Sequence, residues 1–231
     1  MRTHSTLLLI GVLGIELATP ASAANLALAD LTPGDLVITE FLANPVGVAD
    51  TEGEYFEILN RTTSTVDLAG LVVRDDGSNT FTVDALSLAP GGFGVLGNGD
   101  GAALGLTVDH IYGSSMSLTN SADEIVLVGE GDATLFRLAY ADGDAFGAGV
   151  ASELGVARAG LTVTSDGDYT AATSALLLGN LGSPGAAGGT TIPAVPLPGA
   201  AWLLFSALAW LGSIRQRMNR RPVTNCARSA G

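Results

Sequence analysis

The 231-residue sequence predicts an all-β fold, a sandwich or a barrel, with an N-terminal signal peptide and a single C-terminal hydrophobic helix outside it. Three observations predict this fold class. Short runs of alternating apolar and polar residues recur along the chain. Asp-Gly pairs, which are typical of tight turns, begin at Asp76, Asp100, Asp142 and Asp166. The 31 glycines and the aromatic content of 6% fit many short strands joined by turns.

The strands are assigned from this alternation and from the turn residues at their ends. In the run that ends at Asn60, Phe56 and Ile58 fall on one face of a strand, and Tyr55, Glu57 and Leu59 fall on the other. A helix is not expected there, because the apolar residues recur at every second position. Strands are expected over residues 35–42, 53–60, 65–68, 71–74, 80–83, 93–96, 108–112, 124–128 and 134–140, and a less regular strand or arm over 169–179.

An ordered series of short motifs resembles the lamin tail domain of bacterial proteins. The motifs are Glu40-Phe41, Asn44-Pro45, and residues 54–60, 66–71, 88–92, 118–120, 123–127 and 182–185. The sequence departs from the family pattern at Thr39, where asparagine is usual, and at Leu71, where tryptophan is usual. The resemblance covers residues 34–186, and it implies an immunoglobulin-like β-sandwich of the lamin tail type over that range.

The first 23 residues have the features of a secretory signal peptide. Arg2 gives a positive start, and residues 7–15 form an apolar run that is too short to span a bilayer. The small residues Ala21 and Ala23, with Ser22 between them, match a cleavage site. We therefore expect a signal peptide over residues 1–23, with a buried N-terminal strand as the alternative.

A proline motif, an apolar run and a group of arginines follow one another near the C-terminus. Residues 182–198 are rich in Gly and Pro, and we expect a linker over 187–198. An apolar run over residues 200–214 comes next, and arginines after such a run hold a helix in the inner membrane with its C-terminus in the cytoplasm. The motif is Val195, Pro196, Leu197 and Pro198, and the arginines are Arg215, Arg217, Arg220 and Arg221. A plain membrane anchor or a buried helix is the alternative.

This order resembles the PEP-CTERM sorting signal of Gram-negative bacteria, in its Val-Pro-Leu-Pro form, over residues 195–221. The resemblance implies recognition by an exosortase-type processing enzyme and cleavage near the proline motif. The expected location is the inner membrane, through the C-terminal helix, and after processing the cell surface or the extracellular matrix. Surface polysaccharide and envelope proteins are then the expected partners.

The chain is strongly acidic. It has 23 acidic residues, 10 basic residues that are all arginine, and a formal net charge of −13. Only Arg61, Arg74, Arg137 and Arg158 lie between the two predicted targeting segments. Such a surface repels the phosphates of nucleic acids and of anionic lipids, and it attracts divalent cations or basic partners. We therefore expect no nucleic-acid partner.

The sequence lacks the residue sets that nucleophilic catalysis requires. His110 is the only histidine in the predicted domain, no Gly-x-Ser-x-Gly motif occurs, and the single cysteine, Cys226, lies outside the domain. Glu54 and Glu57 are three positions apart, so they fall on opposite faces of a strand and cannot act together on one bond. The lamin tail resemblance implies that this pair belongs to the fold signature, so we expect both to be structural. We also expect no residue to be catalytic and the protein not to be an enzyme.

One acidic loop partly matches a calcium-binding loop. Asp142, Asp144, Gly147 and Glu153 fill positions one, three, six and twelve of such a loop, but Phe146 stands at position five and cannot be a ligand. A hard cation requires more oxygen ligands than this segment offers, so an acidic hairpin loop is the simpler interpretation. Calcium held by Asp142, Asp144 and Glu153 is the alternative, and no other cofactor is expected.

These observations favour a non-catalytic, exported surface or matrix module, with a binding or structural role, that a PEP-CTERM-like tail sorts to the cell envelope. The alternative is an accessory to a divalent-metal-dependent hydrolase or nuclease that uses its acidic loops, because domains related to the lamin tail often accompany such enzymes.

Overall fold

The computed structural model describes residues 25–154, 163–165 and 168–188, which form a β-sandwich with little helix. The predicted signal peptide, the sorting motif Val195–Pro198, the apolar run and its arginines lie outside the described residues, as does most of the predicted linker. In the described ranges, no helix is both long enough and apolar enough to span a bilayer.

The strands and helical turns occur in the following order. The strands are β1 (Leu36–Leu42), β2 (Tyr55–Asn60), β3 (Val66–Asp67), β4 (Val72–Arg74), β5 (Thr80–Thr82), β6 (Ser87–Leu88), β7 (Phe93–Gly97), β8 (His110–Ile111), β9 (Asp123–Val128), β10 (Thr134–Tyr140), β11 (Ser152–Leu154), β12 (Val163–Ser165) and β13 (Tyr169–Ala171). The helix α1 (Asp50–Gly53) is a single turn, and 3-10 turns lie at Leu28–Asp30, Ala102–Leu104, Gly113–Ser115, Glu130–Asp132 and Leu177–Gly179.

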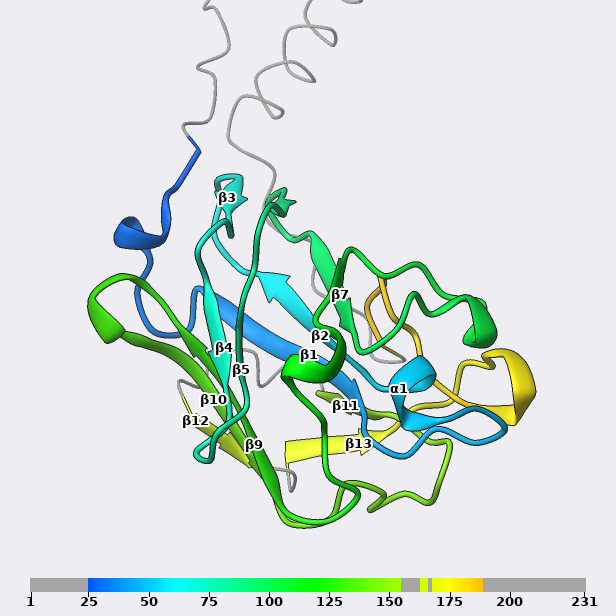
Figure 1. Cartoon of the computed structure of the whole chain (residues 1–231). Coiled ribbons are helices and arrows are strands. Elements are labelled where there is room, and N and C mark those ends of the chain that lie inside the picture. Colours follow the sequence, from blue (N-terminus) through cyan, green and yellow to red (C-terminus); the bar gives the residue numbers. More distant parts are fainter. Residues whose placement is uncertain (1–24, 155–162, 166–167, 189–231) are drawn as a thin grey trace, which may run out of the picture.

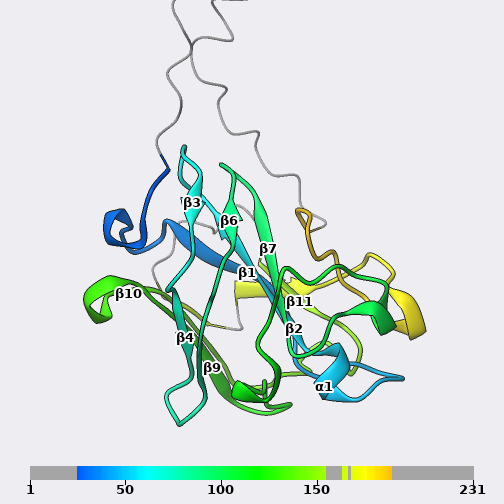
Figure 2. The ribbon, with the colours of Figure 1, turned by 45° about the horizontal axis from the view of Figure 1, so that its top comes forward.

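Two sheets face each other. The large sheet has the order β13-β11-β1-β2-β7-β8, and the small sheet has the order β12-β10-β9-β4-β5. Most neighbours pair antiparallel, and β7 with β8 and β10 with β12 pair in parallel. A short ribbon of β3 and β6 lies at one end of the sandwich (Figures 1 and 2). The two central strands of the large sheet, β1 and β2, are almost entirely buried.

Aromatic side chains join the two sheets in the core. Phe41 of β1 stacks on Tyr140 of β10 with ring centroids 4.8 Å apart, and it meets Tyr169 of β13 edge-on at 5.4 Å. Phe56 of β2 and Phe136 of β10 are fully buried in the same cluster. Burial of these rings, with their mutual stacking, supplies much of the free energy that holds the sheets together.

The outer face of the large sheet is covered as well. Tyr55 and Leu42 point to this side and belong to a second apolar cluster, which is separate from the core between the sheets. Residues 104–108 and 172–181 contribute the cover, through Leu104, Leu106, Val108, Ala172, Leu176 and Leu181. Residues 182–188, which we call the strap, continue across the same face. The large sheet therefore has no broad solvent-exposed side.

All the predicted strands between residues 35 and 140 occur, with small shifts at their ends. The predicted arm at 169–179 is the strand β13 followed by a 3-10 turn at Leu177–Gly179. The strands β6, β11 and β12 and the single turn of α1 are not predicted from the sequence. Each of these strands has only two or three residues, which is too short for alternation to be recognised, and each exists because a distant strand offers an edge to pair with.

The aromatic contacts of Phe41 should be essential for stability. Because Phe41 is buried and touches both sheets, Phe41→Ala should lower the free energy of unfolding by about 3–5 kcal/mol. Phe146 is 38% exposed, so Phe146→Ala is the matched control, and its effect should stay within about 0.5 kcal/mol. Urea denaturation followed by circular dichroism measures both values, and equal effects of the two substitutions would contradict this account of the core.

Candidate functional site

A β-bulge in β1 determines which way Glu40 points. Ile38 pairs with Ile58 of β2, and Glu40 pairs with Glu57, so Thr39 is an extra residue in β1. In a regular strand Ile38 and Glu40 would lie on the same face. The extra residue turns Glu40 away from the core between the sheets and toward the outer face of the large sheet, beside Glu57.

Three glutamates from neighbouring strands therefore lie side by side on this face. Glu40 is opposite Glu57 on one side and opposite Glu153 of β11 on the other. Side chains directly opposite each other in antiparallel strands start about 4.5–5.5 Å apart at Cβ. Glu40 and Glu57 are each 1% exposed, and Glu153 is 5% exposed. We call Glu40, Glu57 and Glu153 the carboxyl cluster.

The strap covers the carboxyl cluster and donates hydrogen bonds to it. The backbone N–H of Ser183 donates to Oε1 and Oε2 of Glu40, at 3.0 and 3.1 Å. The Ser183 hydroxyl lies 3.1 Å from Oε2 of Glu40 and 2.8 Å from Oε1 of Glu153. The Tyr55 hydroxyl also donates to Oε1 of Glu40. The strap is thus attached to the sheet mainly through carboxyl groups.

Glu57 is held from two sides. The Thr39 hydroxyl in the β-bulge donates to Oε1 of Glu57 at 2.5 Å, and the backbone N–H of Gly185 donates to Oε2 at 2.6 Å. Gly185 has a φ of +83°, which glycine adopts without strain. Thr39 therefore places a hydrogen-bond donor next to Glu57.

Burial changes the acidity of the cluster. Removal from water raises the pKa of Glu40 to about 7, and the nearby Glu153 carboxylate also raises it, against the lowering effect of the hydrogen bonds from Tyr55 and Ser183. Removal from water likewise raises the pKa of Glu57 to about 8. Burial of a carboxyl group favours its neutral form. It therefore favours the protonated form of Glu40 and Glu57 up to about neutral pH.

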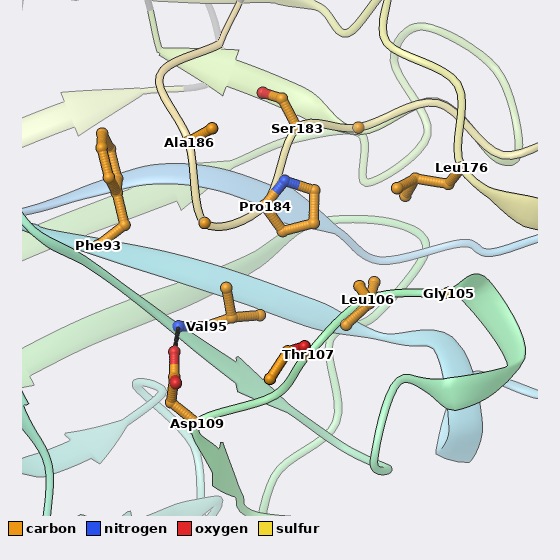
Figure 3. A pocket seen from close by; sticks show the side chains of 12 residues that line it. Phe93, Val95, Gly105, Leu106, Thr107, Asp109, Leu176, Ser183, Pro184 and Ala186 are labelled. Carbon is orange, nitrogen blue, oxygen red and sulfur yellow. Dashed lines mark hydrogen bonds between the residues drawn. The ribbon is translucent and has the colours of Figure 1, made fainter.

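A cavity of about 570 Å³ lies beside the cluster (Figure 3). Its floor includes Val95 of β7, which pairs with Glu57. The strap forms one wall, and the loop at residues 105–109 forms the opposite wall. Asp109 in this loop accepts a hydrogen bond from the backbone N–H of Val95 at 2.9 Å. The lining is mixed, with Phe93, Leu106 and Pro184 as its apolar parts.

The residues predicted for calcium have different surroundings. Asp142 and Asp144 lie in the turn after β10, where Asp144 accepts a hydrogen bond from Nδ2 of Asn44 at 3.0 Å. Glu153 lies in β11 under the strap. Among the described residues, no three His, Cys, Asp or Glu side chains form a group that could hold a metal ion. Calcium binding at this loop stays a prediction.

The other residues singled out in the sequence have structural contacts. His110 stacks on Phe81 with ring centroids 5.4 Å apart. Glu54 accepts hydrogen bonds from the N–H of Leu118 and from Nδ2 of Asn98, so its partners differ from those of Glu57. Asn60 is fully buried, and its Nδ2 donates to three backbone carbonyl groups. The structural role expected for Glu54 and Glu57 stays a prediction.

The carboxyl cluster as a group was not found from the sequence. A signal was available for two of its members, because Glu40 and Glu57 each stand in a run that is apolar on both sides, as in LVITEFL and YFEIL. Such a run predicts a strand buried on both faces, and hence a buried carboxyl group. Glu153 and Ser183 gave no comparable signal, since only long-range pairing brings them to the cluster.

The raised pKa values of Glu40 and Glu57 predict a stability that falls with rising pH. The ordinary pKa of a glutamate is 4.5, and the pKa values of Glu40 and Glu57 in the folded chain are about 7 and about 8. Between these pH values the unfolded chain releases protons that the folded chain retains. The free energy of unfolding should therefore be highest near pH 5 and should fall until about pH 8. Since each unit of pKa difference corresponds to about 1.4 kcal/mol, the fall should be several kcal/mol. Urea denaturation from pH 5 to pH 9 measures it.

Glu57→Gln should make this pH dependence smaller, because glutamine has the same shape and cannot ionise. The matched control is Glu52→Gln at an exposed position, which should leave the profile of the wild-type chain unchanged. A stability that rises between pH 5 and pH 8, or a Glu57→Gln profile identical to that of the wild type, would show that the carboxyl cluster is not protonated in the folded chain.

Comparison with known proteins bears on the first part of the sandwich. No curated protein matches this chain. Glu153 and the strap lie beyond the segment for which a family model is found. Residues 30–142, which contain β1 to β10 and with them Glu40 and Glu57, match the family model of the lamin tail domain.

Proposed function

We propose that this protein is a non-catalytic module that is exported and displayed at the cell envelope, where it has a binding or structural role. The observation that carries this proposal is the order of the parts along the chain. A run with a cleavage motif comes first, a lamin-tail-like sandwich follows, and a proline motif with an apolar run and arginines comes last. Each end has the composition of a targeting signal, and the sandwich between them has its own core.

The contacts of the acidic and basic side chains support a non-catalytic role. A general base requires an orienting partner and a nucleophile within hydrogen-bond reach. In this sandwich, His110 stacks on an aromatic ring, and Glu54 and Glu57 accept hydrogen bonds that position loops. We therefore prefer a binding or structural module to an accessory of a metal-dependent hydrolase or nuclease.

The charge of the chain favours particular partners. A formal net charge of −13 attracts basic surfaces and repels anionic polymers at long range. An envelope protein with a basic patch is therefore the favoured partner. An acidic surface polysaccharide would require divalent cations between the two negative surfaces. A binding assay against both kinds of partner, with and without calcium, distinguishes these modes.

The targeting signals should be removed during export. We expect the mature protein to begin at Ala24, after cleavage behind Ala23, and to end close to Pro198. Mass spectrometry of the protein isolated from the cell surface measures both ends. An intact C-terminus through Gly231 in surface material would contradict processing by an exosortase-type enzyme and would favour a plain membrane anchor.

A substitution in the motif tests whether it is recognised. Pro196→Ala with Pro198→Ala should leave the C-terminal segment attached and the protein in the inner-membrane fraction, since the apolar run and the arginines remain. The matched control is Pro193→Ala, which changes a proline of the same segment outside the motif. Its processing should equal that of the wild-type chain.

A further inference from the structure

The cavity beside the strap combines apolar walls with a carboxylate. The side chains of Phe93, Val95, Leu106 and Pro184 supply much of the apolar part of its lining. Asp109 supplies the carboxylate, and it is the one charged side chain among the described residues that line the cavity. The volume of about 570 Å³ lies within the range of known ligand pockets.

The Asp109 carboxylate is held in place beside the floor of the cavity. Its Oδ2 accepts a hydrogen bond from the backbone N–H of Val95 at 2.9 Å, and the N–H of Asp109 donates to the carbonyl of Val95 at 2.8 Å. Figure 3 shows the carboxylate turned toward β7 between the two walls. A carboxylate has about four acceptor positions, so Asp109 can accept from a further donor. Asp109 is also exposed, so a ligand reaches it from solvent.

An aromatic ring lies on the same face of β7. Val95 pairs with Glu57, whose side chain is on the outer face of the large sheet. Phe93 is two positions from Val95, so it lies on this face as well, about 7 Å along the strand. Its partly exposed ring is part of the cavity lining. The attraction between a cation and an aromatic ring adds to that of the carboxylate.

A protruding leucine lies at the rim of the cavity. Leu177 is 56% exposed, and it follows Leu176, which lines the cavity. On the opposite wall, a Cβ atom at Gly105 would come within 3.0 Å of Cδ1 of Leu177, so this leucine lies against the loop at residues 105–109. Large apolar side chains that stay exposed next to a cavity are typical of binding surfaces. The rim therefore favours a ligand with an apolar part next to its charged part.

An arginine side chain has the chemistry that this lining favours. Its guanidinium group pairs with carboxylates and stacks on aromatic rings, and its methylene stem covers apolar surface. A saccharide would require several polar side chains for its hydroxyl groups. The described lining offers Thr107, Asp109 and Ser183, and the Ser183 hydroxyl is already within hydrogen-bond distance of Glu40 and Glu153. The net charge of −13 also attracts a basic ligand at long range.

We propose that the cavity binds an arginine side chain from a segment of a basic partner. The guanidinium group pairs with Asp109, Phe93 takes one face of the group, and the stem lies on Val95. An apolar neighbour of this arginine in the partner packs on Leu177. The inference rests on the proposed binding role, and it names the contact through which a basic envelope protein is held.

Titration of the full chain with the peptide acetyl-Leu-Arg-Leu-amide, in a non-ionic detergent, tests the site. Methyl NMR signals of Val95, Leu106 and Leu176 report on the cavity, and those of Val73, which is buried between the sheets, are the reference. We expect shifts at the cavity and none at Val73. The matched peptide has citrulline in place of arginine, which keeps the shape without the charge. It should bind about tenfold more weakly or worse, because the charge-assisted pair with Asp109 is lost.

Two pairs of variants locate the site. Asp109→Asn keeps an oxygen that accepts from the N–H of Val95 but removes the charge, so it should weaken binding about tenfold. Asp84→Asn changes an exposed residue outside the cavity lining by the same charge. It should stay within about twofold of the wild type at about 0.15 M salt, where distant charges are screened. Phe93→Ala should weaken binding severalfold, and Phe146→Ala, at another exposed phenylalanine, should not.

Several outcomes would overturn the proposal. These are equal affinities of the two peptides for the wild type, equal affinities of the Asp109→Asn and Asp84→Asn variants for the arginine peptide, or no shift at the cavity with either peptide. Shifts at the same methyl groups with maltose but not with the arginine peptide would identify a saccharide site instead. The comparison of the two peptides needs only the wild type, so it decides the question even if a variant fails to fold.

The outcome is separable from that of the proposed export. Peptide binding is measured on the purified chain, whereas the two ends of the protein at the cell surface report on processing. A correctly processed protein that does not distinguish arginine from citrulline would refute the arginine site alone. An arginine site in a chain that is not displayed would refute the proposed location alone.

Discussion

The structure depends on the burial of the large sheet on both faces. The inner face packs on the small sheet through aromatic and aliphatic side chains, and the outer face is covered by loops and the strap. Any polar side chain of β1 or β2 is therefore removed from water and has to find a partner inside the protein. Glu40 and Glu57 find theirs in Tyr55, Thr39 and the backbone of the strap.

The cover of the outer face comes from parts of the chain that lie far apart in the sequence. Residues 30–142 match the lamin tail domain model, but Glu153, β13 and the strap follow that segment. Glu153 of β11 pairs with Glu40 of β1, β13 pairs with β11, and Ser183 of the strap donates to the Glu40 carboxyl group. Residues that follow the matched segment therefore complete the sandwich. The strap, which leads into the predicted linker, lies on the large sheet.

This arrangement gives the proposed module two layers of different chemistry. A displayed module needs a stable core, and the contacts between Phe41, Tyr140 and Tyr169 provide one that does not depend on protonation. The carboxyl cluster adds a second layer, in which burial raises the pKa of Glu40 and Glu57. The two layers can therefore respond differently to the same change of pH, because the core is apolar and the strap is attached through acids.

The alternation of residues by itself determined the longer strands between residues 35 and 140 and the all-β class of the fold, because apolar burial and turn chemistry are local properties of the sequence. Only the tertiary structure decided that Glu40 points outward, since this depends on the extra residue Thr39 in the pairing of β1 with β2. Only the tertiary structure also places Glu153 and Ser183 next to Glu40. A hydrogen bond between residues more than a hundred positions apart cannot be recognised from either segment alone.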